Sequence, residues 1–253
     1  QVHATADLRG AMRVLREYRQ REMLRIAFGE ILSQHAVETV TAQLTDLADS
    51  IVEGAVWAAR RDVDGRLPPP TDLEGEPLAF CVLALGKLGG CELDYSCELT
   101  LVMIHQGASL RPSMAWAGAG LHDHQNHVDD YFQQLGQGVL KLLSEPTSLG
   151  IAYQVNLLMR PYSGQGPMVA NVDVARQYYD TSGRTWERQA LVKVRPNAGD
   201  QQLGREFIAD MQPWIYRRYL MRADITGLAA LKRRLLRHAS TTVEPNEAGD
   251  YLP

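Results

Sequence analysis

The stretch Gly86-Lys87-Leu88-Gly89-Gly90-Cys91-Glu92-Leu93-Asp94-Tyr95-Ser96-Cys97-Glu98-Leu99-Thr100-Leu101 decides the fold. It follows an apolar run at residues 78–85 and leads into a second one at 99–105, which predicts a glycine turn between two buried strands. Glycines let a backbone approach phosphates closely, and carboxylates beside such a turn can hold a metal ion. Where that chemistry uses two carboxylates two residues apart, this chain has Glu98 and Thr100.

The composition is that of an ordinary globular protein. The chain has 253 residues, of which 45% are hydrophobic and 22% charged, so it can bury a sizeable core. Its net charge of −4 gives no overall attraction to nucleic acid, which we therefore do not expect as a partner. Three cysteines are too few for a disulfide framework, which favours a cytoplasmic location. We expect no membrane association, because no apolar run is long enough to cross a bilayer.

The spacing of apolar residues predicts an α+β protein in which helices flank a small mixed sheet. Strands are expected at 78–85, 99–105 and 151–159, with a loop at 106–120 and helices at 8–32, 37–59, 128–144, 172–179 (capped by Asn171), 203–219 and 228–237. Segment 186–194 fits a helix at its start and a strand at its end. The predicted organisation is an N-terminal helical segment (1–66), a charged and proline-rich linker (67–77), a core (78–200), C-terminal helices (201–240) and a tail (241–253).

Several motifs follow one another in a characteristic order along the chain. They are the runs at 21–27 (REMLRIA), 142–147 (LLSEPT), 160–161 (RP), 163–164 (SG), 166–167 (GP), 185–196 (TWERQALVKVRP), 198–200 (AGD) and 216–220 (YRRYL). Together with the glycine turn they resemble the nucleotidyltransferase domain of the glutamine synthetase adenylyltransferase family, which adds AMP to glutamine synthetase and removes it. The resemblance covers most of residues 21–235.

This resemblance implies a fold, a cofactor set and partners. The fold is a nucleotidyltransferase-type mixed sheet with flanking helices, and the cofactors are ATP and Mg²⁺. The acceptor is glutamine synthetase or a related protein, with a PII-type protein as a candidate regulator, while the direction of AMP transfer stays open. Because the family's enzymes are much longer and contain two such halves, this chain resembles a fragment or a single-unit relative.

The family's three metal-binding Asp positions fall on residues that have largely lost their charge. They correspond to Glu98, which keeps a carboxylate, and to Thr100 and Asn156, which are neutral. Since Mg²⁺ prefers anionic oxygen ligands, we expect impaired or lost two-metal catalysis. Glu98 is either a remaining metal ligand or an exposed acid at a strand edge. Glu92 and Asp94 either supply replacement charge or are solvated loop acids.

Other residues are candidates for binding the nucleotide. In the glycine turn they are Gly89, Gly90 and Ser96, where the glycines either approach phosphates or make an ordinary turn. The basic candidates either converge on a triphosphate or form ion pairs with acids at the sheet surface; they are Arg160, Arg188, Lys193 and Arg195. On a strand, Lys193 and Arg195 would share one face.

Two functional classes remain open. One is a catalytic adenylyl-transfer domain, and the other is a degenerate domain that senses nucleotide or docks a protein without chemistry. A third class concerns His124, His127 and Asp130, which would share a helix face. They form either a zinc site or the polar start of a helix. This third class also includes the basic residues within 217–237, which suit nucleic acid, a solvated helix face or an acidic protein partner.

Overall fold

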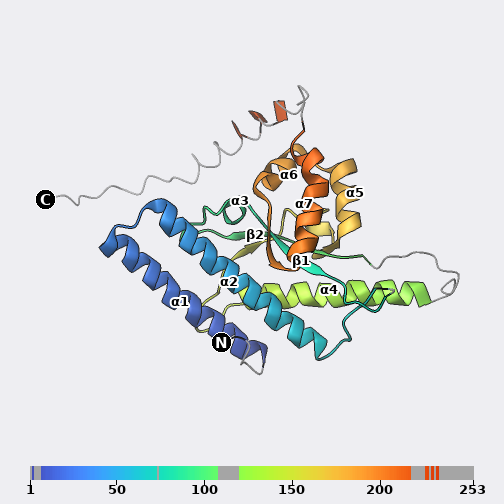
Figure 1. Cartoon of the computed structure of the whole chain (residues 1–253), viewed down its shortest axis with the longest axis horizontal. Helices are drawn as coiled ribbons and strands as arrows, with labels where there is room; N and C mark the ends of the chain where they lie inside the picture. Colours follow the sequence, from blue (N-terminus) through green and yellow to red (C-terminus); the bar gives the residue numbers. More distant parts are fainter. Residues whose placement is uncertain are drawn as a thin grey trace.

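The computed structural model describes residue 2 and residues 7–72, 74–107, 120–217, 226–227, 229–230 and 232–233, without the side chains of 120–125. It begins with a hairpin of two long helices, α1 (Leu8–Ser33) and α2 (Val37–Asp64), which lies along one side of the molecule (Figure 1). Both helices were predicted, although α2 extends past residue 59. No helix in the described part of the chain is long and apolar enough to cross a membrane.

In the described part of the chain, five strands form one mixed sheet. The strands are β1 (Phe80–Leu85), β2 (Leu99–His105), β3 (Val155–Asn156), β4 (Val169–Asn171) and β5 (Arg195–Gly199). β1 lies antiparallel between β2 and β5, and both β3 and β4 run parallel to β2 on its other edge. The helices are α3 (Gly86–Gly89), α4 (Gly120–Ser144), α5 (Val172–Ser182), α6 (Thr185–Ala190) and α7 (Gln201–Ile215). This confirms the α+β class.

Alternate residues of β1 point into two separate hydrophobic cores. Phe80, Val82 and Ala84 face the core shared with α1, α2 and α4. Cys81, Leu83 and Leu85 face the core shared with α5 and α7. Figure 1 shows the resulting three layers, with the sheet between the long helices and the α5–α7 group. The N-terminal helices are therefore part of the same core as the sheet.

The third predicted strand is much shorter than expected. Of residues 151–159, only Val155 and Asn156 pair with β2. Before them, the amides of residues 152 and 153 donate to the Leu143 carbonyl at the end of α4. After them, the Asn156 Oδ1 accepts from the Leu158 N–H at 2.9 Å, which turns the chain away from the sheet. The chain bonds to a helix end and then to its own side chain, so the strand stays short.

The ambiguous segment 186–194 is resolved in favour of a helix. It forms α6 and then a 3₁₀ turn at Leu191–Lys193, and β5 begins only at Arg195. The Asn171 cap of α5 is confirmed, because its side chain accepts from the Asp173 N–H at 2.9 Å. Most of the predicted loop 106–120 and most of residues 218–253 lie outside the described residues, and with them the predicted helix 228–237.

Two glycines inside α4 allow its neighbours to approach closely. A Cβ at Gly136 would lie 2.5 Å from Val169 Cγ2 of β4, and a Cβ at Gly138 would lie 3.0 Å from Ala59 Cβ of α2. These distances leave no room for a side chain at Gly136 and little at Gly138. The glycines weaken the helix intrinsically but permit it to pack between the sheet and α2.

Arg16 joins α1 to the C-terminal end of α4. Its side chain is 1% exposed and donates to the carbonyls of Leu142, Glu145 and Gly150, as well as to Met12 in its own helix. The last carbonyls of a helix have no partner inside the helix, so a buried helix end needs outside donors. Arg16 supplies them from α1.

We predict that Arg16→Met lowers the free energy of unfolding by about 2–4 kcal/mol, because it leaves several buried carbonyls without a donor. Urea denaturation followed by circular dichroism measures the loss. The matched control is Arg13→Met, since Arg13 is 70% exposed and pairs with Glu17 on the same helix; its effect should stay within about 0.5 kcal/mol. Equal losses in the two variants would contradict this role for Arg16.

His105 ends β2 inside the core. It is 1% exposed, its ring stacks on Phe132 at 4.4 Å between centroids, and its Nδ1 lies 2.9 Å from the Gln106 carbonyl oxygen. Burial lowers the pKa of His105, although the Asp129 carboxylate, 3.9 Å from its Nε2, acts in the opposite direction. The folded chain therefore holds this histidine neutral at pH values where the unfolded chain protonates it.

We predict that the free energy of unfolding falls as the pH drops below about 6.5, by at most about 1.4 kcal/mol per pH unit from this residue. The sign follows because the unfolded state binds the proton and the folded state does not. Urea titrations between pH 7.5 and 5 should show a smaller slope in His105→Phe than in the unmodified chain. An unchanged slope in His105→Phe would refute the assignment.

Candidate functional site

The three positions that the sequence singled out as metal-binding lie together. Thr100 and Asn156 are directly paired between β2 and β3, and the Asn156 Nδ2 donates to the Glu98 Oε1 at 2.7 Å. Thr100 lies opposite Leu85 of β1, so the cluster lies on the sheet face that α5 and α7 cover further along. Two distant segments of the sequence thus meet at one end of β2.

The orientation of the Asn156 amide is set by the turn that follows β3. Its Oδ1 accepts from the Leu158 N–H, so its NH₂ group must be the end that points at Glu98. A hydrogen-bond donor therefore stands beside the carboxylate at this point. The cluster contains one negative charge, on the exposed Glu98 side chain.

These residues do not fit a two-metal centre. Such a centre uses several carboxylates to hold two divalent cations, whereas this cluster offers one carboxylate, one hydroxyl and one amide. Across the described residues, no group of three or more His, Cys, Asp and Glu side chains is placed to hold a metal ion. Glu98 remains the single anionic candidate ligand.

The glycine turn begins beside this cluster and is packed against a distant segment. Gly86 has φ +60°, and a Cβ there would lie 3.8 Å from Thr100 Oγ1. A Cβ at Gly89 would lie 2.2 Å from the Lys193 carbonyl oxygen, and one at Gly90 would lie 2.7 Å from Lys193 Cδ. Gly89 and Gly90 thus have a packing reason to be glycine, and their approach to phosphate stays a prediction.

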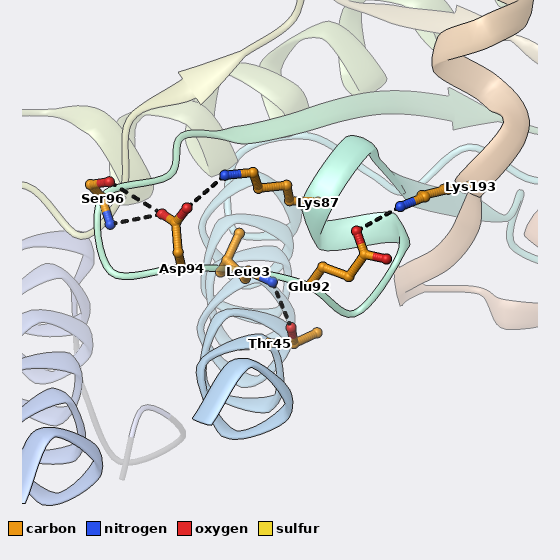
Figure 2. A network of polar contacts seen from close by, with 7 residues as sticks. All are labelled: Thr45, Lys87, Glu92, Leu93, Asp94, Ser96 and Lys193. Carbon is orange, nitrogen blue, oxygen red and sulfur yellow. Dashed lines mark hydrogen bonds and ion pairs between the residues drawn. The ribbon is translucent and has the colours of Figure 1, made fainter. Parts of the chain in front are cut away.

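The acids of the loop are paired with lysines. Figure 2 shows the Asp94 Oδ2 at 2.6 Å from Lys87 Nζ and the Glu92 Oε2 at 2.6 Å from Lys193 Nζ. Asp94 also accepts from the backbone N–H of Ser96 at 3.1 Å and from its hydroxyl at 3.2 Å. These ion pairs favour the view that Glu92 and Asp94 balance the lysine charges over the view that they act as replacement metal ligands. Ser96 donates to Asp94 and so stabilises the turn there.

The loop is held in place by contacts to the helical hairpin. Leu93 is 1% exposed, and its N–H lies 3.4 Å from the Thr45 hydroxyl of α2 (Figure 2). The Tyr95 hydroxyl donates to the Glu30 carboxylate of α1 at 2.7 Å. Lys87 was not among the predicted site residues. The available signal was an aspartate, Asp94, seven residues after it in the same loop.

The predicted basic residues do not all converge on the cluster. Arg195 lies opposite Ala84, on the other face of the sheet from Thr100, and its Nη2 bonds Asp49 of α2 at 2.8 Å. Arg188 is 4% exposed, with its guanidinium 5.1 Å from the Trp214 ring. Arg160 donates to the Leu157 carbonyl at 2.9 Å. For Lys193 and Arg195, the structure shows the ion pairs that the sequence left open as the alternative.

The histidine cluster is only partly described. His127 Nε2 lies 3.0 Å from the Pro68 carbonyl oxygen. The side chain of His124 lies outside the described residues, so zinc binding there stays a prediction. Most of the basic C-terminal residues also lie outside them.

The mixed sheet, the glycine turn and the cluster at the end of β2 define an α+β domain of the nucleotidyltransferase type. The family model described as glutamate-ammonia ligase adenylyltransferase matches residues 1–210, and the chain belongs to this family. This confirms the resemblance found in the sequence motifs.

Three relatives are each named bifunctional glutamine synthetase adenylyltransferase/adenylyl-removing enzyme. The protein from Thioalkalivibrio sulfidiphilus is 35% identical over 241 residues, which are 94% of this chain and 24% of the relative. Those from Methylococcus capsulatus and Pseudomonas aeruginosa are each 33% identical, over 93% and 87% of this chain and 24% and 22% of the relatives. The chain thus spans about a quarter of the length of these relatives.

We predict that Asn156→Asp makes the stability of the chain depend on divalent cations. With EDTA at pH 7 the variant places two carboxylates face to face, which should lower the free energy of unfolding by up to about 1 kcal/mol. Millimolar Mg²⁺ should restore the loss. Lowering the pH towards about 4 should also restore it, because repulsion raises the pKa of one carboxyl and the folded state then gains a proton.

Thermal unfolding with and without Mg²⁺ measures this effect. Asn156→Ala is the control, because it loses the same hydrogen bond without adding a charge and should not respond to Mg²⁺. A Mg²⁺ response in Asn156→Ala equal to that in Asn156→Asp would contradict the prediction.

Proposed function

We propose that this chain is a nucleotidyltransferase-like domain of the adenylyltransferase family in which two-metal catalysis is impaired or lost. The observation that carries the proposal is the hydrogen bond from the Asn156 amide to Glu98, with Thr100 beside it in the sheet. Two divalent cations bring four positive charges to the reacting oxygens, and neutral side chains at two of the three positions do not balance them. What remains is a scaffold that can bind a nucleotide or a protein without catalysing AMP transfer.

The ligand and partners that we propose follow from the family. The nucleotide is ATP, bound at the glycine loop, where Lys87 and Lys193 supply positive charge once they leave their ion pairs with Asp94 and Glu92. This binding does not require Mg²⁺. The acceptor or docking partner is glutamine synthetase or a related protein in the cytoplasm, since the relatives' names concern that enzyme. A PII-type regulator is part of the same proposal.

A second candidate function is protein docking without nucleotide. The C-terminal half of α1 exposes an apolar stripe at helical spacing, with side chains that are 58–73% exposed: Leu24, Phe28, Ile31 and Leu32. Such stripes usually pack against another surface. This alternative gains support if the chain does not bind nucleotide.

Calorimetric titration with ATP, in Mg²⁺ and in EDTA, tests the proposal. We predict binding in both conditions with dissociation constants that differ by less than about threefold, or about 0.7 kcal/mol. Binding that needs Mg²⁺ would show that Glu98 and its neighbours still form a working metal site. Absence of binding in both conditions would favour the docking alternative.

Restoring the carboxylates tests the catalytic part. We predict that Thr100→Asp combined with Asn156→Asp strengthens ATP binding in Mg²⁺ by about tenfold, or about 1.4 kcal/mol, without a comparable change in EDTA. The unmodified chain should transfer no labelled AMP to glutamine synthetase. Mg²⁺-dependent AMP transfer by the unmodified chain would disprove the loss of catalysis.

A further inference from the structure

We propose that Glu92 and Asp94 are built-in competitors for phosphate, which hold Lys193 and Lys87 in ion pairs that an anionic ligand has to displace. The inference rests on the proposed function, in which the glycine loop binds a nucleotide. It adds that these two acids set the affinity of the loop for the nucleotide. The chemical class of the ligand is a polyphosphate, either free or as part of a nucleotide.

Each of the two pairs is electrically neutral. Lys87 and Lys193 carry two positive charges, and Asp94 and Glu92 carry two negative ones, at 2.6 Å in each pair. All four side chains are 42–57% exposed, so a ligand in solution can reach them. Ion pairs this exposed are weak enough to be exchanged for a more highly charged partner.

The loop fixes the acids more firmly than the lysines. Leu93, between the two acids, is buried against α2, and Tyr95 is bonded to Glu30 of α1. The acids therefore stay where they are, while each lysine carries its charge on a flexible four-carbon stem. A lysine can swing to a phosphate, but the acid that it leaves behind then repels that phosphate.

The side chain of Lys193 lies over Gly90 in the glycine turn, where we propose that the ligand binds. A Cβ at Gly90 would lie 2.7 Å from Lys193 Cδ and 3.4 Å from Glu92 Cδ, so the stem of the lysine and the carboxylate both lie over the glycine. Figure 2 shows this side chain reaching the loop from the segment before β5. The Lys193–Glu92 pair thus covers Gly90 of the glycine turn.

The competition depends on ligand charge and salt rather than on pH in the neutral range. Hydrogen bonds from the Cys97 thiol and from Lys87 hold the pKa of Asp94 well below its usual range, and Asp94 in turn raises the pKa of Lys87. Both members of this pair are therefore charged across neutral pH. A polyphosphate with several negative charges displaces one carboxylate by charge alone.

The test compares Glu92→Gln and Asp94→Asn, which keep the shape of each acid and remove its charge. Titration with ATP and with inorganic tripolyphosphate in EDTA should show dissociation constants about three- to tenfold lower for each variant at low ionic strength. The gain should shrink towards unity in about 0.5 M salt, because exposed charges are then screened. Asp62→Asn is the matched control: it removes one charge from the ion pair between Asp62 of α2 and Arg66, which lies just after that helix, and should change affinity less than twofold.

Each outcome decides the proposal. A weaker affinity in Glu92→Gln would mean that Glu92 orients Lys193 for the ligand, and affinities equal to that of Asp62→Asn would mean that the acids do not compete; either result overturns it. ATP binding by the unmodified chain without a gain in the variants leaves the proposed function standing. If even the Glu92→Gln/Asp94→Asn double variant binds no polyphosphate, both proposals fail. Adding Lys193→Ala to the double variant should remove the part of the gain that comes from Glu92→Gln and leave the part that comes from Asp94→Asn.

Discussion

The pairing of β3 with β2 through only two residues is the constraint on which the site depends. It brings Asn156 next to Thr100 and within hydrogen-bond distance of Glu98. The same asparagine also turns the chain out of the sheet through its bond to the Leu158 N–H. An aspartate could make that turn as well, but its second oxygen would then face Glu98 with like charge and would need a cation or a proton between them. Asn156 lets the fold close there without a metal ion.

The sheet separates the polar chemistry onto two faces, and the glycine loop connects them. Thr100 lies on the face of Leu85, whereas Arg195 lies on the face of Ala84, where Asp49 of α2 binds it. The loop starts next to Thr100 at Gly86 and continues beneath Lys193. The loop therefore lies beside Thr100 and carries the two lysine pairs, and Arg195 reaches it only through a hydrogen bond to the Leu88 carbonyl at 3.0 Å.

The sequence predicted the parts of the fold that depend on local patterns. The helical spacing at residues 8–32 and 37–59 agrees with the structure, because the apolar residues of each segment recur on one helix face. The bounds of β2 at Leu99–His105 also agree, because a short, nearly continuous apolar run is typical of a strand that is buried on both faces. The cluster of Glu98, Thr100 and Asn156 was found because ordered family motifs fix which residues correspond. The strand predicted at 151–159 was too long. Alternation of apolar residues does not show that backbone amides of this segment donate to the Leu143 carbonyl and to the Asn156 side chain instead of to a neighbouring strand. The directions of Arg188, Lys193 and Arg195 were not predictable either, since a change from α6 to a 3₁₀ turn to β5 within a few residues sets them.

The most direct test of lost two-metal catalysis is to count the metal ions that the domain holds. Electron paramagnetic resonance can measure how many Mn²⁺ ions bind per chain when a non-hydrolysable ATP analogue is present. We predict no protein-bound ion in the unmodified chain beyond the one that the nucleotide itself carries, and a second ion only after a carboxylate is restored, in Asn156→Asp or in Thr100→Asp/Asn156→Asp. Two saturable Mn²⁺ ions in the unmodified chain would contradict the claim that this site has lost its two-metal chemistry.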